Sequence, residues 1–232
     1  MIHQLIFAHP KPGMSEKEFQ TYWKDVHAVR YASKIPQIRR YMIDCRISTE
    51  PEPDDPLWSG VAEIWFDNEQ DQLASLQTPE FLEGARLDEP NWAAFWRSVV
   101  LDTDTHVLME GPPETPQSSM VKILAMVKRK AGMPLEEFRR HSLDVHGPLD
   151  LKLPGLRRYH QCHVRDSAYT VGESLLDAVS MLWFDDIAAM EAALASPESK
   201  ASADDLANFI EPKYAHVMVT DETWIIGPEP RY

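Results

Sequence analysis

The sequence predicts an α+β protein built from two ferredoxin-like repeats, each with the element order β-α-β-β-α-β. Three observations lead to this fold class. The second half of the chain matches the first along its length, short apolar runs alternate with segments of helical spacing in both halves, and a Pro-rich segment divides them. At 232 residues the chain is long enough for two domains of ordinary size.

Internal repetition is the most informative of these observations. The tripeptide Asp-Val-His occurs at residues 25–27 and again at residues 144–146, an offset of 119 positions. Further along the chain the offset becomes 118, where residues 39–41 and 65–67 match residues 157–159 and 183–185. Because the matches follow one another in order over half of the chain, they indicate a duplication and not a shared short motif.

The strands of both repeats follow from the same kind of pattern. Apolar, partly β-branched runs bounded by turn residues predict buried strands at residues 2–8 and 121–127. The remaining strands are expected at residues 40–47, 60–66 and 106–109, and at residues 158–164, 178–184 and 223–226.

The first helix of each repeat follows from apolar residues at helical spacing, such as Phe19 and Trp23. Ser15 followed by Glu18 forms a capping box that predicts where this helix begins. In the second repeat Pro134 lies near the first helical position, where its missing N–H costs nothing. A second helix is expected from about residue 68, with a new turn at residues 78–80.

A ferredoxin-like sheet carries helices on one face only, so its other face needs a cover. We therefore expect the two repeats to pack sheet to sheet as an intramolecular α+β barrel with an enclosed interior. The repeats are assigned to residues 1–110 and 120–232. Residues 111–119, which contain three prolines and no large apolar residue, are assigned to a linker. Residues 51–56 are also Pro-rich and predict a long loop within the first repeat.

Composition and charge exclude several classes of function. The formal net charge is −14, from 37 acidic and 23 basic residues, and such a surface repels nucleic-acid phosphates and anionic lipids. No apolar run reaches the length of a membrane span, and the first residues lack the layout of a secretion signal. Cys45 and Cys162 alone make no disulfide framework. We expect a cytoplasmic protein with a small-molecule substrate and no nucleic-acid or membrane partner; pairing into a homodimer is left open.

Several segments together resemble the signature of the EthD family. In the second repeat these are Phe138, His141 and residues 146–149 (His-Gly-Pro-Leu), 154–156 (Pro-Gly-Leu) and 158–159 (Arg-Tyr). The first repeat has a less complete version, made of Phe19, Tyr22, Trp23, His27, Pro36 and residues 40–41. The resemblance covers nearly the whole chain, once in each repeat, and is more specific for fold than for chemistry.

The resemblance implies a fold of the dimeric α+β barrel group, whose members normally pair two chains. In layout the chain is similar to muconolactone methylisomerase and, more distantly, to small polyketide cyclases and quinone-forming monooxygenases. Those enzymes mostly work without a metal ion or organic cofactor, in a pocket between sheet and helices. The resemblance therefore implies no cofactor and no metal site here.

His146 is the first candidate for catalysis. It follows Val145 at the edge of the core-facing stripe, and Pro148 disfavours further helix at Gly147, so we expect His146 at the helix end. An imidazole there faces the interior and can titrate near neutrality, as general acid–base catalysis requires. The alternative is a helix-end histidine that only satisfies a free carbonyl group. His27, its duplicate, is the second candidate.

Tyr159 and Tyr41 begin the second strand of each repeat and are the other catalytic candidates. A tyrosine that closes a pocket can donate a hydrogen bond to a developing oxyanion, although packing with the hydroxyl group in water is commoner. The resemblance to the isomerase, which has a tyrosine after its Pro-Gly-Leu segment, favours Tyr159. The substrate-binding candidates are Trp183, Trp65 and His141; for the two tryptophans core packing is the commoner role.

Two other arrangements are weaker. Asp25 and Asp144 precede their histidines by two positions, which on a helix turns the side chains about 200° apart, so they cannot orient the histidines. His141 and His146 are five positions apart, not the four that would place two metal ligands on one helical face.

The repeats differ where the signature is strongest. Residues 147–149 (Gly-Pro-Leu) correspond to residues 28–30 (Ala-Val-Arg), so we expect the pocket of the second repeat to be the working one. The leading hypothesis is a cofactor-independent isomerase, lyase or cyclase acting on a small apolar carbonyl, lactone or aromatic compound. His146 would move the proton and Tyr159 would stabilise the oxyanion. The alternatives are a cofactor-free or haem-linked monooxygenase and a non-catalytic EthD module that binds a small molecule.

Overall fold

The computed structural model describes residues 1–49 and 55–232, which form two compact units. One unit holds residues 1–102, 114–118 and 221–232, and the other holds residues 103–113 and 119–220. The predicted repeat bounds of 1–110 and 120–232 refer to sequence repeats and stay a prediction. Most of the predicted Pro-rich loop at residues 51–56 lies outside the described residues. No helix among the described residues is both long and apolar enough to cross a membrane.

Three strands form the centre of the first unit: β1 (Ile2–Ala8), β2 (Arg40–Arg46) and β3 (Gly60–Phe66). β3 lies between the other two and pairs antiparallel with both, with Ile2 opposite Phe66 and Arg40 opposite Trp65. These strands have the bounds that the apolar runs predicted, within one residue.

The second unit repeats this pairing with β5 (Val121–Val127), β6 (Leu156–Val164) and β7 (Ala178–Phe184). β7 lies in the middle, with both Val121 and Leu156 opposite Phe184. β4 (Val99–Met109) pairs with β6, from Thr103 opposite Val164 to Met109 opposite Tyr159.

β4 and β8 (His216–Ile226) are shared, because each has residues in both units. Both are longer than predicted, since acidic and threonine side chains interrupt the apolar pattern in their first halves. Through these shared strands the sheet closes in the order β1-β3-β2-β8-β5-β7-β6-β4, an antiparallel barrel. The predicted α+β class, with two ferredoxin-like repeats in a closed barrel, is confirmed.

Helical segments of the first unit begin where side chains cap them. Ser15 and Glu18 form the predicted capping box at the start of α1 (Glu16–Tyr22), with the Glu18 carboxylate 2.9 Å from the Ser15 backbone nitrogen. Asn68 caps α2 (Glu69–Ser75). The remaining segments are α3 (Arg86–Asp88), π-helical turns at Trp23–Ala28 and Glu80–Ala85, and 3-10 turns at Ala32–Lys34, Glu89–Asn91 and Phe95–Arg97.

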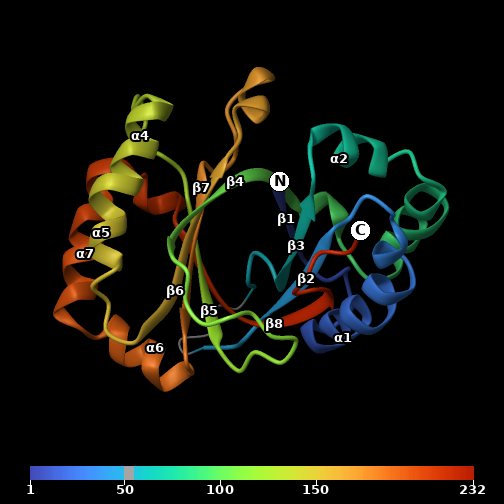
Figure 1. Ribbon diagram of the computed structural model, residues 1–232, viewed down its shortest axis with the longest axis horizontal. Helices are drawn as coiled ribbons and strands as arrows, with labels where there is room; N and C mark the ends of the chain where they lie inside the picture. Colours follow the sequence, from blue (N-terminus) through green and yellow to red (C-terminus); the bar gives the residue numbers. More distant parts are fainter. Residues whose placement is uncertain (50–54) are drawn as a thin grey trace. The chain divides into compact units, whose positions relative to one another are not determined.

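Helices of the second unit lie together along one face of β5, β6 and β7, as Figure 1 shows. They are α4 (Leu135–His141), α5 (Gly147–Asp150), α6 (Ile187–Leu194) and α7 (Pro197–Phe209), with a π-helical turn at Ser142–His146 and 3-10 turns at Asp166–Thr170 and Pro212–Tyr214.

The prediction that the helix ends at His146 is wrong. The helical segment continues through Pro148 as α5, because Pro148 occupies one of the first positions of that segment, where no backbone N–H is needed. The π-helical turn at Ser142–His146 precedes it and inserts one extra residue into the helix. His146 is nevertheless buried, with 6% of its surface exposed, as its place on the core-facing stripe predicted.

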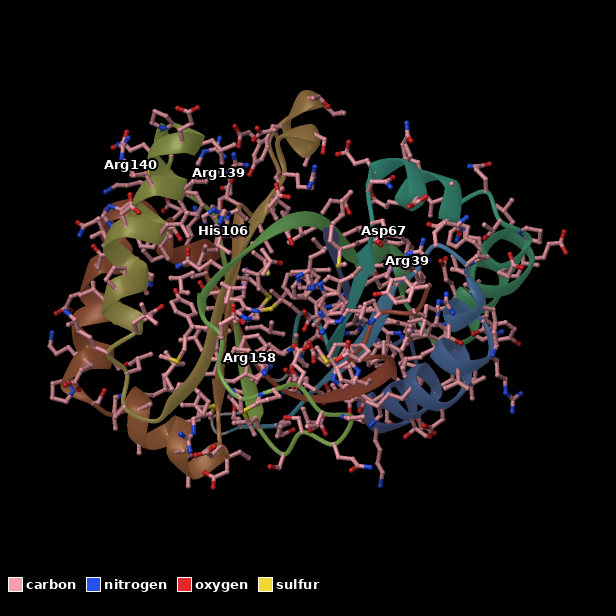
Figure 2. The ribbon with its side chains drawn as sticks, viewed as in Figure 1. Arg39, Asp67, His106, Arg139, Arg140 and Arg158 are labelled. Carbon is pink, nitrogen blue, oxygen red and sulfur yellow. The ribbon has the colours of Figure 1, made fainter. Side chains whose placement is uncertain are left out.

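One ion pair that repeats in the sequence forms in both repeats. Arg39 pairs with Asp67 at 2.7 Å between Nε and Oδ2, a pair labelled in Figure 2, and Arg157 pairs with Asp185 at 2.7 Å. Each pair joins the start of one strand to the end of its neighbour. Such exposed pairs contribute at most about 1 kcal/mol each, so their value here is as a structural signature of the duplication.

The two repeats fill the space between helices and sheet differently. In the first repeat an apolar cluster fills it, with Phe19 and Trp23 packed on Tyr41, Ile43 and Cys45 of β2. In the second repeat the apolar cluster is smaller and centres on Phe138, Ala178, Phe209 and Ile210. Polar side chains occupy the remainder of that space.

At Gly60 the first repeat is packed so tightly that no side chain fits. A Cβ atom there would lie 2.5 Å from the Asp44 backbone oxygen and 3.1 Å from Cζ3 of Trp23. We expect Gly60→Ala to lower the free energy of unfolding by about 1–3 kcal/mol through overpacking, as measured by urea denaturation. Gly172→Ala is the matched control, because nothing lies within 4 Å of the Cβ position there. Equal losses in the two variants would contradict this account.

Candidate functional site: a buried polar network in the second repeat

His146 lies between two carboxylates of the second repeat. Its Nδ1 is 3.2 Å from Oδ2 of Asp205 in α7, and its Nε2 is 3.4 Å from Oδ2 of Asp150 in α5. The first distance is close to an ordinary hydrogen bond, whereas the second is long. Asp205 therefore orients the imidazole, and Nε2 is the nitrogen whose present contact is weak enough to be exchanged for a substrate.

Asp205 is held in its ionised form by several donors. Burial alone would raise its pKa, but the hydrogen bonds from Asn208, His141 and His146 hold the pKa of this carboxyl group below its usual value. His141 Nε2 lies 3.0 Å from Oδ2, and Asn208 Nδ2 donates to Oδ1 at 2.9 Å. The ring of Phe209 is 4.9 Å from that of His146 and excludes water from this side.

Asp150 links the histidine to the tyrosine that the sequence singled out. The Tyr159 hydroxyl group donates to Oδ2 of Asp150 at 2.9 Å, and Gln161 Nε2 donates to the Tyr159 oxygen at 2.6 Å. Burial, with the Asp150 charge beside it, raises the pKa of Tyr159 well above its usual value, so the hydroxyl group stays a donor. Ser202 of α7 also donates to Asp150.

The network continues along β6 toward His163. Ser142 Oγ donates to Oε1 of Gln161 at 2.8 Å, and Gln161 Nε2 donates to the Ser142 backbone oxygen at 3.0 Å. His163 Nε2 lies 3.3 Å from the same Oε1, so it is the protonated nitrogen of the ring. Burial, and then the nearby His106 and Arg139, lower the pKa of His163 to about 3.

His106 and Arg139 form the outer end of the network. The His106 ring lies 4.7 Å from that of His163, at 54°. Figure 2 shows Arg139 and His106 close together beside α4, with Arg140 on the other side of the helix. Arg139 Nη1 pairs with Asp166 at 2.7 Å. Burial lowers the pKa of His106, so this end of the network holds neutral imidazoles beside one guanidinium.

The first repeat keeps the histidine–aspartate pair. His27 Nδ1 lies 2.9 Å from Oδ2 of Asp88, and Asn91 donates to Asp88 at 3.0 Å. Trp92 Nε1 also points at Nδ1 of His27 from 3.1 Å, but one nitrogen can serve only one of these partners. Hydrogen bonds from Asn91, His27 and Tyr22 outweigh burial and lower the pKa of Asp88, so the ionised carboxylate is the stronger partner. Burial lowers the pKa of His27, although the Asp88 carboxylate beside it acts in the opposite direction.

Tyr22, at the position of His141, likewise donates to Asp88 at 2.8 Å. Five other members of the polar network are replaced in the first repeat. The positions equivalent to Ser142, Asp150, Gln161, His163 and Ser202 hold Trp23, Tyr31, Ile43, Cys45 and Ala85. Tyr41 is fully buried in the apolar cluster, and that burial raises its pKa. The structure therefore brings His146, Tyr159 and His141 together in one polar network. In the first repeat His27 keeps its carboxylate partner Asp88, whereas Tyr41 lies in an apolar cluster.

The two tryptophan candidates lie elsewhere. Trp183 packs against the guanidinium of Arg158 at 5.3 Å, and Arg158 adjoins Tyr159 on β6, so the two side chains point to opposite faces of the sheet. Trp65 stacks on His3 with the ring centroids 4.3 Å apart and lies 4.6 Å from the Arg40 guanidinium. Trp183 also lies 5.0 Å from the ring of His160. Each tryptophan therefore packs against a histidine other than the catalytic candidate of its repeat.

Comparison with known proteins decides the family. The EthD domain model matches residues 11–95 and again residues 130–213. The chain belongs to the EthD family. No curated protein matches it.

Solved structures of similar fold carry names of oxidising enzymes. An anthrone oxidase-like protein matches this EthD chain with a TM-score of 0.65 and 13% identity, over 97% of this chain and 92% of that one. A candidate monooxygenase from Fusobacterium nucleatum matches with a TM-score of 0.60 and 8% identity, over 99% and 95%. Another from Lactobacillus acidophilus matches with a TM-score of 0.54 and 13% identity, over 99% and 97%. At these identities the likeness shows the fold alone.

Sequence reasoning missed the carboxylates of this EthD protein. Asp25 and Asp144 are exposed, as expected, and the partners are instead Asp88 and Asp205. A signal was present: Asp-x-x-Asn followed by an aromatic residue occurs at residues 88–92 and again at residues 205–209, at an offset of 117.

A cluster of three carboxylates in the first unit was also not foreseen. Oxygen atoms of Asp44, Glu63 and Glu222 lie within 4.8 Å of one another, and His3 Nε2 is 2.7 Å from Glu63. Carboxylates are the ligands that hard divalent cations prefer, but the histidine beside them equally makes an ion-paired core. The expectation of no metal site stays a prediction.

The low pKa of His163 makes a testable contribution to stability. The unfolded chain binds a proton at this residue below about pH 6.5 and the folded chain does not, so stability falls as the pH drops through that value. His163→Gln can keep a hydrogen bond to Gln161 but cannot titrate. Between pH 7 and pH 5 we expect its free energy of unfolding to fall by about 2 kcal/mol less than that of the native chain. Urea denaturation at both pH values measures this difference, and parallel losses would show that His163 does not titrate as described.

Proposed function

We propose that this EthD protein is a cofactor-independent enzyme that removes a proton from a small, largely apolar phenol or carbonyl compound at His146, and that dioxygen then oxidises the resulting anion. For a methylene group activated by neighbouring rings, O2 supplies the carbonyl oxygen, and its second oxygen leaves as water with the two methylene hydrogens. The reaction balances without an external reductant. Asp205 would orient His146, and the Tyr159 hydroxyl group would stabilise the anion by donating a hydrogen bond.

The polar network of the second repeat is the observation that carries this proposal. His146 Nδ1 is held at 3.2 Å by an ionised carboxylate while Nε2 has only a 3.4 Å contact, which is the arrangement of a general base with an orienting group. The names of the structural neighbours, an anthrone oxidase-like protein and two candidate monooxygenases, favour oxygen as the acceptor. They are names of proteins that share only the fold.

A second candidate function uses the same groups without oxygen. An isomerase, lyase or cyclase would return the proton at another atom of the substrate. The Tyr159 hydroxyl group, kept protonated by burial beside Asp150, supports this alternative because it can donate a hydrogen bond to a developing oxyanion. Oxygen uptake separates the two reactions, and a haem-linked oxygenase would add a Soret band to the spectrum of the purified protein.

We expect His146→Ala to reduce turnover by about 100-fold or more, because a general base typically contributes at least that much. Oxygen consumption with anthrone as the probe substrate measures the oxidative reaction. His27→Ala is the matched control. His27 also has an aspartate partner and is buried to a similar degree, but its repeat lacks the extended polar network. We expect it to keep most of the activity.

Equal loss in both variants would contradict the assignment to the second repeat. No loss in either, with turnover intact, would contradict catalysis by these histidines. Binding of anthrone without any turnover in the native protein would favour a non-catalytic binding module.

Tyr159→Phe should lower kcat by about tenfold while leaving the Asp205–His146 pair in place, because it removes the donor to Asp150. Tyr41→Phe is the control, since Tyr41 lies in an apolar cluster. The pH dependence of kcat provides the second readout: a change in Tyr159→Phe is expected, and an unchanged profile with unchanged kcat would show that Tyr159 only packs.

A further inference from the structure

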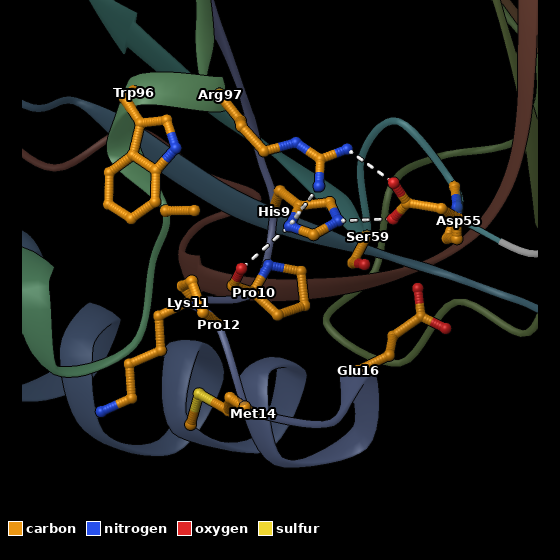
Figure 3. A pocket seen from close by; sticks show the side chains of 13 residues that line it. His9, Pro10, Lys11, Pro12, Met14, Glu16, Asp55, Ser59, Trp96 and Arg97 are labelled. Carbon is orange, nitrogen blue, oxygen red and sulfur yellow. Dashed lines mark hydrogen bonds and ion pairs between the residues drawn. The ribbon is translucent and has the colours of Figure 1, made fainter.

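A pocket of about 600 Å³ opens in the first unit at the end of β1. Figure 3 shows Trp96 and Arg97 on one side of it and Lys11 and Met14 on the other. A volume of this size is typical of sites for small organic ligands. No function discussed above uses it.

The second repeat fills the equivalent place with its own side chains. Backbone hydrogen bonds establish the equivalence: Lys11 N to Trp92 O at 3.0 Å corresponds to Lys130 N to Phe209 O at 2.9 Å. Ser59 N to Ala8 O at 2.9 Å likewise corresponds to Asp177 N to Val127 O at 2.8 Å.

Two substitutions at these equivalent positions open the pocket. In the second repeat Arg129 reaches Asp177 through an ion pair, and Lys128 reaches the same carboxylate at 3.0 Å. The first repeat has Pro10 in place of Arg129 and Ser59 in place of Asp177. Both replacements are short and uncharged, so the charged pair that fills one repeat is absent from the other.

Arg97 is presented to this space by a fixed segment. It ends the 3-10 turn Phe95–Arg97, and its backbone oxygen accepts a hydrogen bond from Trp58 Nε1 at 3.2 Å. Its guanidinium has only long contacts, 3.3 Å to Asp55 Oδ2 and 3.4 Å to His9 Nδ1, drawn in Figure 3. The Asp55 side chain is 69% exposed, so water competes for this pair.

Apolar groups flank these donors. The Trp96 indole is 76% exposed, which is unusual for the largest apolar side chain, and Met14 lies across the pocket from it. Lys11 adds a second positive charge, with no ion-pair partner among the residues that the structure describes. The pocket thus combines a flat aromatic face with a guanidinium and an ammonium group. Two carboxylates also line it, Asp55 beside Arg97 and Glu16, which is paired with Arg46.

We propose that this pocket binds a small aromatic monocarboxylate, with the carboxylate on Arg97 and the ring against Trp96. A guanidinium binds a carboxylate through two parallel N–H donors, and the indole face stacks on a planar ring. One charge on the ligand suits the site better than two, because the chain as a whole carries −14 and repels multiply charged anions.

Isothermal titration calorimetry with 2-naphthoate tests the proposal on the full chain. We expect one binding event per chain with a Kd of about 1 mM or tighter, and binding at least tenfold weaker for the uncharged isostere naphthalene-2-carboxamide. Arg97→Gln should weaken naphthoate binding at least tenfold and Trp96→Ala about fivefold. Arg157→Gln removes another exposed arginine, in the second repeat, and should change nothing.

Equal affinity for naphthoate and its carboxamide, or full affinity in a folded Arg97→Gln, would overturn the proposal. If Arg97→Gln does not fold, Trp96→Ala decides, because an indole that is 76% exposed can be removed without loss of the core; unchanged affinity there would overturn the proposal as well. Naphthoate binding retained in His146→Ala places the ligand in this pocket and not at the proposed catalytic base, and its loss in that variant would contradict the proposal.

Discussion

In each repeat a buried carboxylate ties the first helical segment to the last one. Asp88 does this for His27 and Asp205 for His146, and a following asparagine fixes each carboxylate. Removing one member of such a pair leaves a buried polar or charged group unsatisfied, which typically costs about 3–5 kcal/mol, so the pair persists as a unit. Because it is present in both repeats, one of them filled by apolar side chains, the pair by itself indicates a structural role and does not establish a catalytic one.

Function has to be argued from what surrounds that shared pair. In the first repeat Trp23 fills the space between helix and sheet, and Gly60 leaves room for it. In the second repeat Ser142 stands at the position of Trp23, and the space admits Gln161 and Asp150 instead. Burying polar groups gains little stability compared with apolar packing, even when every group finds a partner. A polar network that the first repeat folds without is therefore a better indication of chemistry than the histidine alone.

The fold could be predicted from the sequence because each element was encoded twice. Apolar runs bounded by turn residues predicted most strand bounds, helical spacing predicted the first helix, and each pattern could be compared between the two copies. The error at His146 arose because Pro148 was taken to end the helix, whereas proline is accepted in the first turn of a new helical segment. The strands β4 and β8 were predicted too short because polar residues interrupt their apolar pattern, Asp102–Asp104 in β4 and Thr220–Glu222 in β8.

The site was predictable only in part. Helical spacing predicted the burial of His146. Tyr159 is also buried, and its hydroxyl group donates to Asp150, a partner that the sequence did not predict. Asp205 lies 59 residues from His146, and contact between segments so distant follows from tertiary packing and not from local pattern. Only the repetition of the Asp-x-x-Asn motif in both halves of the sequence could have suggested this contact.

The two repeats have diverged in opposite directions on one backbone. Where the first repeat is closed by Trp23, the second has a polar network. Where the second is closed by the Arg129–Asp177 pair, the first has an open pocket. Strand register and the histidine–aspartate pairs are the same in both, so these exchanges altered side chains that line spaces and spared those that set the fold. A duplicated chain can make such exchanges independently in each copy, which is how two repeats with one fold come to differ in chemistry.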